Sequence, residues 1–404
     1  MKQQQSKTKR PHLRKIRNQN RALLLRTMRI HGAISRQELA EKMNLTPASV
    51  SRITKELIAE DICFEDPVLR KDNQLGRPNV SLHINPAGGF LIAISLSSMS
   101  RLISVTDVSG HTHHQKEIPM ETVLSAANTI EYIGDYIDKL VSNGLLQRNR
   151  VLGAVLSIPG SINATTGHLT KSVFVSWPNF PIIDRLHRRL GCPVRVENIG
   201  DALCMYCLDD ASVNRKPNLN IFLVHVAASM GASLAIGGQI VKRLADEGWI
   251  NDILVPSNCG THGKFIKLSQ VASGRAILKK IGTSESNMMV KQVDFSACIQ
   301  AAVELANAED GDHRKTFFDA GHALGVSLLS LTIASAPDFI TIAGPVISAD
   351  AYVHGTRAGY EQAARDMGIK ACEIVECKAS YIQASERLAL HEHFFKGAIP
   401  PNLE

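Results

Sequence analysis

The sequence predicts an α/β protein in which an N-terminal winged helix-turn-helix precedes two α/β lobes. The first observation is a capped, basic helical segment at residues 46–57, directly after a shorter capped helix. The second is charge, since residues 1–85 hold 17 basic and 8 acidic residues in a chain of net charge +7. The third is a change, from about Asn85 onward, to strands that alternate with helices. A chain of 404 residues is too long for one core, so we expect domains at 1–85, 86–215 and 216–404.

Two short segments with strong starting signals predict the helix-turn-helix. Ser35 can cap the helix RQELAEKM, and Glu38 three residues later completes a capping box. Thr46 can cap the next helix, which begins with Pro47. Taken alone, this second helix is better explained as an ordinary amphipathic surface helix, but its neighbours in sequence favour a major-groove reader. We therefore expect contacts to DNA from Arg36, Thr46, Ser49, Ser51, Arg52 and Lys55.

Basic residues extend upstream of the helix-turn-helix. Residues 1–30 contain ten Lys or Arg and no acidic residue. A solubilising tail explains this excess within residues 1–10, but not its continuation through an apolar-periodic helix that ends near Gly32. We interpret the excess as a phosphate-binding surface.

A wing is predicted downstream. Residues 62–64 and 80–84 have the character of two strands that can pair. The segment between them contains Gly76-Arg77-Pro78, and we expect Arg77 to enter a narrow, A·T-rich minor groove. The competing interpretation is an exposed loop whose arginine only adds charge.

The remaining sequence predicts two successive α/β lobes related by internal duplication. Each lobe begins with strands and continues with helices. The clearest strands are expected at 90–96, 102–108, 151–158, 194–196, 221–226, 232–236, 339–343 and 372–375. Ligands of such sheets lie beyond the carboxyl ends of strands. This rule singles out Pro159-Gly160, Glu197-Asn198, Ala227 to Gly231 and Gly344-Pro345.

Composition excludes several other classes. The sequence lacks a run of about 18 apolar residues, and its basic N-terminus has no apolar run behind it, so we expect neither a membrane span nor a signal peptide. Eight scattered cysteines are typical of reduced thiols in a cytoplasmic protein. Cys204 and Cys207 have redox or zinc spacing but no second pair nearby, so we expect them to pack in a core.

The ordered motifs of the two lobes resemble the ROK family, which groups sugar-responsive repressors with sugar kinases. The resemblance extends from Asn18 to about His393 and implies two actin-like (ribonuclease H-like) lobes with a ligand cleft between them. The motifs that carry it are LSIPG at 156–160, WPNFP at 177–181, VRVEN at 194–198, AASMGASLAIGGQIV at 227–241 and APDFITIAGPVI at 336–347.

The sequence departs from the family's kinases at both catalytic motifs. Where they place an aspartate and paired glycines, this chain has the run ISLSS at residues 94–98. The base of the kinases is an aspartate directly after asparagine, whereas Asn198 is followed here by Ile199. Asp201 would be displaced from that position by about 5 Å along a helix. We expect no catalytic residues and no kinase activity, because isoleucine cannot accept a proton.

The family's zinc module is also degenerate in this sequence. Trp249 stands where the family has histidine, and Ser257 and Lys264 stand where it has cysteines. Cys259 and His262 supply at most two of the four ligands that structural zinc requires. We expect no metal and no other cofactor.

These substitutions change the effector site that the resemblance implies. Of the family's four polar sugar contacts only Asn198 remains, since Ile199, Trp249 and Ile266 occupy the other positions. Trp249 can stack on the apolar face of a ring or can be plain core. His225 is a further polar candidate. We expect the effector site to contain Gly160, Asn198, Asp201, Asp246 and Trp249.

These observations predict a DNA-binding transcriptional regulator, a repressor of a carbohydrate or related catabolic or transport operon. Its partners would be double-stranded DNA, a sugar or sugar-like effector in the interlobe cleft, and other copies of itself in a homodimer or larger homo-oligomer. Two alternatives stay open. One is a sugar kinase with a DNA-binding appendage, and the other is a DNA-binding dimer that responds to no ligand.

Overall fold

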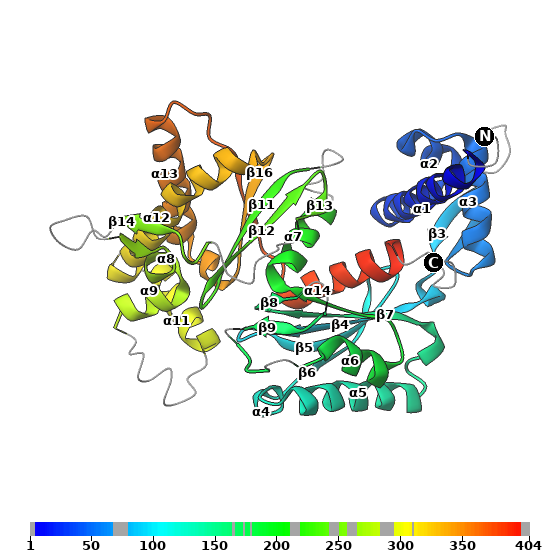
Figure 1. The fold of residues 1–404 in the computed structure, drawn as a ribbon, viewed down its shortest axis with the longest axis horizontal. Coiled ribbons are helices and arrows are strands. Elements are labelled where there is room, and N and C mark those ends of the chain that lie inside the picture. Colours follow the sequence, from blue (N-terminus) through cyan, green and yellow to red (C-terminus); the bar gives the residue numbers. More distant parts are fainter. Residues whose placement is uncertain are drawn as a thin grey trace.

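A computed structural model describes most of the chain as an N-terminal head and two lobes (Figure 1). The head lies beside the first lobe, on the side away from the second. The described residues are 5–67, 80–163, 166–172, 174–177, 180–210, 219–241, 250–256, 265–282, 295–308 and 311–396.

The head is a winged helix-turn-helix, as the sequence predicted. Both predicted caps are present, including the reciprocal capping box of Ser35 and Glu38. Residues 62–64 and 80–84 were expected to pair, and β2 and β3 do so with Cys63 opposite Ile84. The head consists of α1 (Gln5–His31), β1 (Ile34–Ser35), α2 (Arg36–Met43), α3 (Pro47–Ala59), β2 (Cys63–Pro67) and β3 (Val80–Ile84).

The first lobe is built on a five-stranded sheet of order β10-β7-β4-β5-β6. Its strands are β4 (Phe90–Leu96), β5 (Arg101–Asp107), β6 (Thr112–Glu117), β7 (Val151–Ile158) and β10 (Val194–Asn198), with β8 (Ser161–Ile162) and β9 (Leu169–Lys171) in a separate small sheet. Its helical elements are η1 (Pro86–Gly88), α4 (Met120–Val123), α5 (Ala126–Ser142), η2 (Arg148–Arg150), α6 (Ile182–Leu190) and α7 (Ile199–Asp209).

The second lobe repeats this topology, with sheet order β13-β12-β11-β16-β17. In each sheet three antiparallel strands are followed by two parallel ones, as an internal duplication predicts. Its strands are β11 (Ile221–Val226), β12 (Met230–Ile236), β13 (Gln239–Ile240), β16 (Phe339–Ala343) and β17 (Ile374–Cys377), with β14 (Leu254–Pro256) and β15 (Phe265–Lys267) as a separate pair. Its helices are α8 (Ser269–Ala272), α9 (Gly274–Lys280), α11 (Phe295–Ala308), α12 (Asp312–Ser335), η3 (Pro345–Ser348) and α13 (Asp350–Asp366).

The C-terminal helix returns to the first lobe after the second lobe is complete. It consists of α14 (Tyr381–Ala389) and continues as one turn of π-helix, η4 (Leu390–Phe395). The ring of His393 lies where a Cβ on Gly153 of β7 would stand, and its Nε2 is 3.0 Å from the Ala154 carbonyl oxygen. The division expected at 86–215 and 216–404 grouped this helix with the second lobe, whereas these contacts place it on the sheet of the first.

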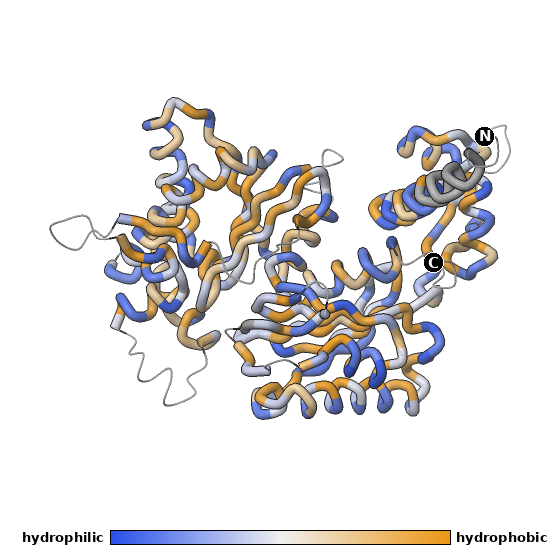
Figure 2. The backbone as a smooth tube through the Cα atoms, in the orientation of Figure 1, coloured by the Kyte–Doolittle hydropathy of each residue, from blue (hydrophilic) through white to orange (hydrophobic). Residues whose placement is uncertain are grey.

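Three apolar cores stabilise the molecule. One fills the first lobe between its sheet and α5 and α6, and another fills the second lobe around α12. The third is continuous from the head to α7, α14 and η4, so the head packs on the lobes through a shared core. Figure 2 shows the apolar strands β4, β7, β11 and β16 that these cores bury.

Helices α12 and α13 pack with their backbones in contact. A Cβ on Gly321 would lie 2.1 Å from the Tyr352 carbonyl oxygen, and one on Gly355 would lie 2.1 Å from that of Phe318. Within the described residues, α12 is the one helix whose length and composition would allow it to cross a membrane. Because it is a packed core helix of this lobe, that property is weak evidence for a span.

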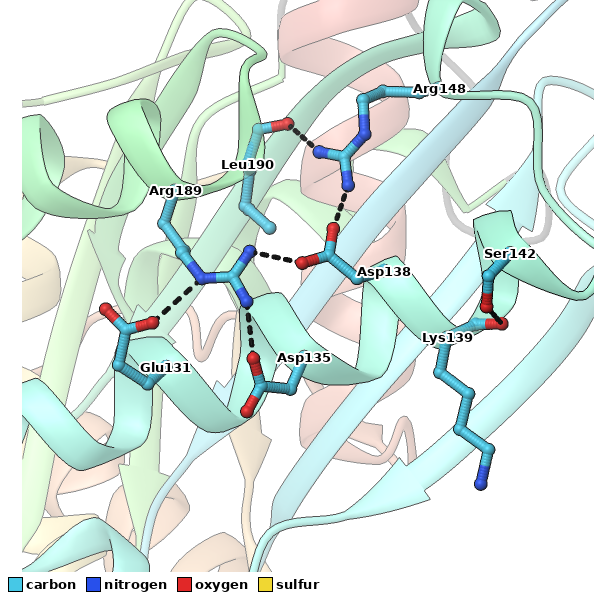
Figure 3. Close-up of polar contacts among 8 residues, drawn as sticks. All are labelled: Glu131, Asp135, Asp138, Lys139, Ser142, Arg148, Arg189 and Leu190. Carbon is cyan, nitrogen blue, oxygen red and sulfur yellow. Dashed lines mark hydrogen bonds and ion pairs between the residues drawn. The ribbon is translucent and has the colours of Figure 1, made fainter.

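Helix α6 is fastened to α5 by one arginine on the outer surface of the first lobe (Figure 3). Arg189 donates from Nε to Glu131 at 2.9 Å, from Nη2 to Asp135 at 2.5 Å and from Nη1 to Asp138 at 2.8 Å. Arg148 binds the other carboxylate oxygen of Asp138 and the Leu190 carbonyl oxygen. Each of the five charged side chains of this cluster thus contacts a charge of opposite sign.

Several elements differ from expectation. Helix α1 begins at Gln5, well inside the stretch for which a solubilising tail had been considered. Its apolar residues do not all face the core: Leu24, Leu25 and Met28 are buried, whereas Leu23 and Ile30 are 45% and 47% exposed. Strands β1 and β6 were not predicted, since β1 has two residues and β6 is a polar edge strand without apolar alternation.

Candidate DNA-binding head and interlobe cleft

Helix α3 has the geometry of a recognition helix. The Thr46 hydroxyl accepts the Ser49 backbone N–H at 3.3 Å and donates to the Ser49 hydroxyl at 2.9 Å, which satisfies one of the free N–H groups of the first turn. Val50, Ile53 and Leu57 are buried against the rest of the head, as their spacing predicted. The opposite face is therefore the one available to DNA.

The predicted contact residues on α3 differ in exposure. Arg52 and Lys55 are exposed, and within the described part of the chain neither has an ion pair or side-chain hydrogen bond. Ser49 and Ser51 are half-buried, and the Ser51 carbonyl oxygen accepts the Thr54 hydroxyl at 3.2 Å. The two cations are thus the side chains best placed to reach a nucleic acid.

Arg36 has partners within the head. Its Nε donates to the Thr54 hydroxyl at 2.9 Å, and Nη1 forms an ion pair with Glu65 on β2. These contacts hold the wing strand against α3. A contact of Arg36 with DNA stays a prediction, and Arg77 lies outside the described residues.

Two of the basic side chains of α1 form ion pairs within the head. Arg17 pairs with Glu56 of α3 at 2.7 Å, and Arg21 pairs with Glu60, the residue that follows α3 as its C-cap. Arg21 is only 7% exposed. These two arginines therefore fix α1 to the recognition helix, and the expectation that the whole excess forms a phosphate-binding surface is wrong for them.

A cavity of about 840 Å³ lies between the two lobes. Its walls come from the carboxyl ends of strands in both sheets, as the strand-end rule predicted. The residues that line the cavity include Ser97, Gly160, Asn198, Ile199, His225, Ala227, Asn251, Arg275 and Tyr381.

Asn198 joins two strand ends at the floor of this cavity. Its Oδ1 accepts the Gly200 N–H at 2.7 Å and caps α7, while Nδ2 donates to the Gly160 carbonyl oxygen at 2.5 Å. The structure thus brings the predicted Gly160 and Asn198 together. One N–H of the Asn198 amide stays available to a ligand.

Asp201 points away from the cavity. Its carboxylate accepts the Ser233 hydroxyl at 2.7 Å, and Asp201 is not among the lining residues. The helical phase of α7 turns it toward β12, so its assignment as an effector contact is not supported. The other predicted contacts, Asp246 and Trp249, lie outside the described residues, as do Cys259 and His262 of the degenerate zinc module.

His225 and Tyr381 form a polar pair in the cavity wall. The His225 Nε2 and the Tyr381 hydroxyl are 2.5 Å apart. Burial lowers the pKa of His225 to about 4 and raises the pKa of Tyr381, so both are neutral near pH 7. Sequence reasoning named His225 but missed Tyr381, which follows β17 at a capping-box helix start and could have been found by the strand-end rule.

The loop where kinases cradle phosphate is closed on itself here. The Ser97 hydroxyl accepts the N–H groups of Met99 at 3.1 Å and Ser100 at 3.0 Å, and the Ser97 N–H donates to the Ser100 carbonyl oxygen. These backbone donors are therefore not free for a phosphate. Ile199 presents an apolar side chain where the kinase base would stand.

Asn251 supports the loop between β11 and β12, which opens the motif at residues 227–241. Its Oδ1 accepts from the Ser229 hydroxyl and the Met230 N–H, and its Nδ2 donates to the Met230 carbonyl oxygen at 2.6 Å. Sequence reasoning missed Asn251, for which no motif gave a signal. Among the described residues no cluster of three His, Cys, Asp or Glu side chains could hold a metal ion.

A winged helix-turn-helix joined to a two-lobed, actin-like body with a cleft defines a class of ligand-binding DNA-binding proteins. A family model described as the ROK family matches residues 92–385, and one described as the MarR family matches residues 18–63. The chain therefore belongs to the ROK family, with a MarR-type helix-turn-helix in front.

Curated relatives of this chain are named as transcriptional repressors or regulators. A xylose repressor of Caldicellulosiruptor bescii is 23% identical over 335 residues, which cover 80% of this chain and 82% of the relative. The DNA-binding transcriptional dual regulator NagC of Escherichia coli K12 is 23% identical over 342 residues, covering 83% and 82%.

Solved structures confirm the fold. A ROK family transcriptional regulator, a homologue of the E. coli MLC protein, has a TM-score of 0.70 at 21% identity and covers 94% of this chain and 98% of its own. A ROK hexokinase from Thermus thermophilus has a TM-score of 0.56 at 17% identity, covering 75% and 98%. Because the kinase shares the lobes, the fold alone does not separate regulator from enzyme.

Proposed function

We propose that this protein is a DNA-binding transcriptional repressor of a carbohydrate operon, acting in the cytoplasm where its operator lies. The observation that carries DNA binding is the capped helix α3, whose exposed Arg52 and Lys55 have no protein partner within the described residues. Two curated relatives that match at least 80% of this chain are named as a xylose repressor and as a transcriptional dual regulator.

DNA binding is tested with a promoter fragment from the protein's own locus. Affinity should fall steeply as salt rises, because bound phosphates release counterions. Arg52→Ala should weaken specific binding by about 1–3 kcal/mol if Arg52 contacts a base edge. Arg365→Ala, an exposed arginine on α13, is the matched control and should change nothing. If no genomic fragment binds better than random DNA, the proposal is wrong.

Arg77 is proposed to read minor-groove width. Arg77→Ala should then lose affinity mainly on sites with A·T-rich flanks, where the groove is narrow and its potential most negative. Arg77→Lys should restore only part of that loss, because an ammonium is costlier to desolvate. A uniform loss across all flanks, fully restored by lysine, leaves only a phosphate contact.

We propose that the interlobe cavity binds a sugar or sugar-like effector. Its volume of about 840 Å³ is within the range of small-molecule sites. Thermal unfolding with D-xylose and with N-acetyl-D-glucosamine tests binding, since a ligand of the folded state raises the Tm. Asn198→Ala should abolish the shift relative to its own ligand-free Tm, whereas Asp201→Asn, outside the cavity, should keep it. Absence of a shift with either sugar favours the ligand-independent alternative.

The protein is proposed to lack kinase activity. Support comes from Ile199 and from the Ser97 turn, which occupies the backbone donors of a phosphate cradle. Incubation with ATP, magnesium and a panel of hexoses and acetamido-sugars should give no phosphorylated product above background. Phosphorylated sugar formed by the wild type, and lost on Asn198→Ala, would establish the alternative of a sugar kinase with a DNA-binding appendage.

We propose that the body forms a homodimer, which supplies two heads for a pseudo-palindromic operator. On the second lobe, α12 exposes Phe318, Val326 and Ile333, large apolar side chains that a second copy would cover. Light scattering should give a dimer mass for the wild type and a monomer mass for Val326→Glu with Ile333→Glu. A dimer that survives this double substitution has its interface elsewhere.

A further inference from the structure

Two helices extend from the interlobe cavity to the DNA-binding head. Helix α7 begins at Ile199 in the cavity wall and ends at Asp209, about 15 Å away at 1.5 Å per residue. Helix α14 begins at Tyr381, also in the wall, and its π-helical continuation η4 ends at Phe395. Figure 1 shows α14 and η4 running between the lobes toward the head.

The far ends of these helices meet α1 of the head. Arg26 donates from Nη2 to the Nδ1 of His391 at 2.5 Å, and its guanidinium lies 5.5 Å from the centroid of the Phe395 ring. Asp209 lies close enough to Arg26 and Arg29 for their charges to act on its carboxylate. The contact between body and head is therefore a cluster of half-buried charges, with acid and base supplied by different domains.

This charged cluster is incompletely paired. The Nε atoms of Arg26 and Arg29 and the Oδ2 of Asp209 are buried and have no hydrogen-bond partner among the described residues. Burial, with Arg387 nearby, lowers the pKa of Arg29 to about 10, and burial raises the pKa of Asp209 against the pull of the arginines. Unsatisfied buried polar atoms raise the free energy of the present arrangement of head and body. A second arrangement of these two parts can therefore lie close to it in free energy.

The opposite side of α14 also rests on polar contacts. Glu386 accepts hydroxyl hydrogen bonds from Ser104 and, at 3.0 Å, from Thr112. The buried hydroxyls of Ser95 and Ser157 on the same sheet lack partners among the residues described. A helix seated on hydroxyl groups can exchange one set of hydrogen bonds for another when it shifts.

Helix α1 connects this joint to the recognition helix. Arg26 and Arg29 contact the body, while Arg17 and Arg21, on the preceding turns, pair with Glu56 of α3 and with Glu60, its C-cap. The apolar core that includes Leu24, Leu25 and Met28 continues without interruption into α7, α14 and η4. A displacement of α1 is thus transferred to α3.

We propose that α7 and α14–η4 are coupling helices, which change the orientation of the DNA-binding head when the cleft changes state, through the charge cluster of Arg26, Arg29, Asp209 and His391. This inference rests on the proposed function of the cleft and head. It assigns a regulatory role to residues that touch neither DNA nor effector. Coupling of this kind requires an element with two conformations, and both the cleft and the head must shift the equilibrium between them.

A double-mutant cycle tests the coupling without an identified effector. Tyr381→Phe removes the hydroxyl at the cleft end, and Asp209→Asn neutralises the head end. In the full-length protein, Tyr381→Phe should change the Kd for the promoter fragment by about three-fold or more, within the range expected for a perturbed coupling network. In the Asp209→Asn background the same substitution should change the Kd by less than about 1.5-fold. Tyr352→Phe removes a buried hydroxyl of the second lobe and should leave the Kd unchanged in both backgrounds.

Two results would overturn the proposal. One is an effect of Tyr381→Phe that is equal in both backgrounds, and the other is no effect of Tyr381→Phe on folded protein. Hydrogen exchange gives a second readout that needs no DNA, since Tyr381→Phe should alter exchange in residues 17–31 of the wild type but not of Asp209→Asn. If the wild type fails to bind promoter DNA, the proposed function is wrong, while unchanged exchange in residues 17–31 independently rejects the coupling.

Discussion

The molecule contains two arginine clusters that are built in opposite ways. Arg189 on the surface of the first lobe meets three carboxylates, and each accepts a hydrogen bond from its guanidinium (Figure 3). Arg26 and Arg29 at the head are half-buried, but their Nε atoms are enclosed and have no partner within the described residues. Partial burial lowers the pKa of Arg189, but its hydrogen bonds to Asp138, Glu131 and Asp135 outweigh this effect, so the pKa is raised. The pKa of Arg29, in contrast, is lowered by burial.

The difference follows from what each cluster joins. The Arg189 cluster fixes two helices of one lobe, α5 and α6, which have no reason to move relative to each other. The second cluster joins two domains, the head and the body, whose relative orientation is the quantity that the proposed coupling changes. A fully paired cluster stabilises one arrangement, and an incompletely paired one leaves a second arrangement within reach.

The largest expected effect comes from removing the acid of the second cluster. Asp209→Ala leaves Arg26, Arg29 and Arg387 without the acidic charge that offsets their own, which should lower the free energy of unfolding by about 1–3 kcal/mol. Urea unfolding measures this loss. Asp135→Ala in the surface cluster is the matched control and should cost less than about 1 kcal/mol. Equal losses would remove the distinction between the clusters.

The next effect concerns the cleft end of the coupling helices and depends on pH. The pKa of His225 falls from 6.5 to about 4 on folding because the ring is buried. Its folded-state pKa is depressed, so as pH falls the unfolded chain binds the proton first. The free energy of unfolding should therefore drop between about pH 6.5 and pH 4, by up to about 3 kcal/mol. His225→Gln should flatten this part of the stability profile, and an unchanged slope would contradict the assignment.

A third substitution separates charge from packing in the second cluster. Arg29→Met keeps an unbranched apolar stem and removes a half-buried charge that is incompletely paired. The free energy of unfolding should stay the same or rise by about 1–2 kcal/mol, as for buried ion pairs replaced by apolar groups. Chemical unfolding of Arg29→Met beside Asp209→Ala measures the contrast. A loss as large as that of Asp209→Ala would show that the guanidinium itself stabilises the joint.

The smallest effect is expected in the surface cluster. Arg189→Met should cost about 1 kcal/mol at low salt, because its carboxylate partners are largely exposed. Raising the salt to about 1 M should shrink the cost, since exposed charges are screened within about 3 Å there. A cost independent of salt would mean that Arg189 acts by packing on Gly134 rather than by charge.

Local signals predicted the elements of this fold that local interactions determine. The sequence correctly predicted the caps at Ser35 and Thr46 and the strands β7, β11 and β16. A capping side chain or a buried apolar run can be recognised within a few residues. Strand β6 was missed, since a polar edge strand is specified by its pairing with β5.

The residues of the candidate site were harder to predict from the sequence, for a related reason. Gly160 and Asn198 were found because strand ends carry them to the same edge of one sheet. Asp201 was misplaced, since its direction depends on how α7 is rotated against β12, which no spacing reveals. The partners of Arg17, Arg21, Arg26 and Arg29 depend on tertiary contacts, so the sequence showed their charge but not its use.

The position of the C-terminal helix has a consequence for synthesis of the chain. Domains generally fold as they leave the ribosome, N-terminal ones first. Here His391, His393 and Phe395 support β7 and the head, which were made hundreds of residues earlier. A nascent chain that has completed both sheets still lacks this support. A copy that lacks these residues would carry a complete recognition helix on an unsupported head, so a segment translated late completes the support of a domain translated hundreds of residues earlier.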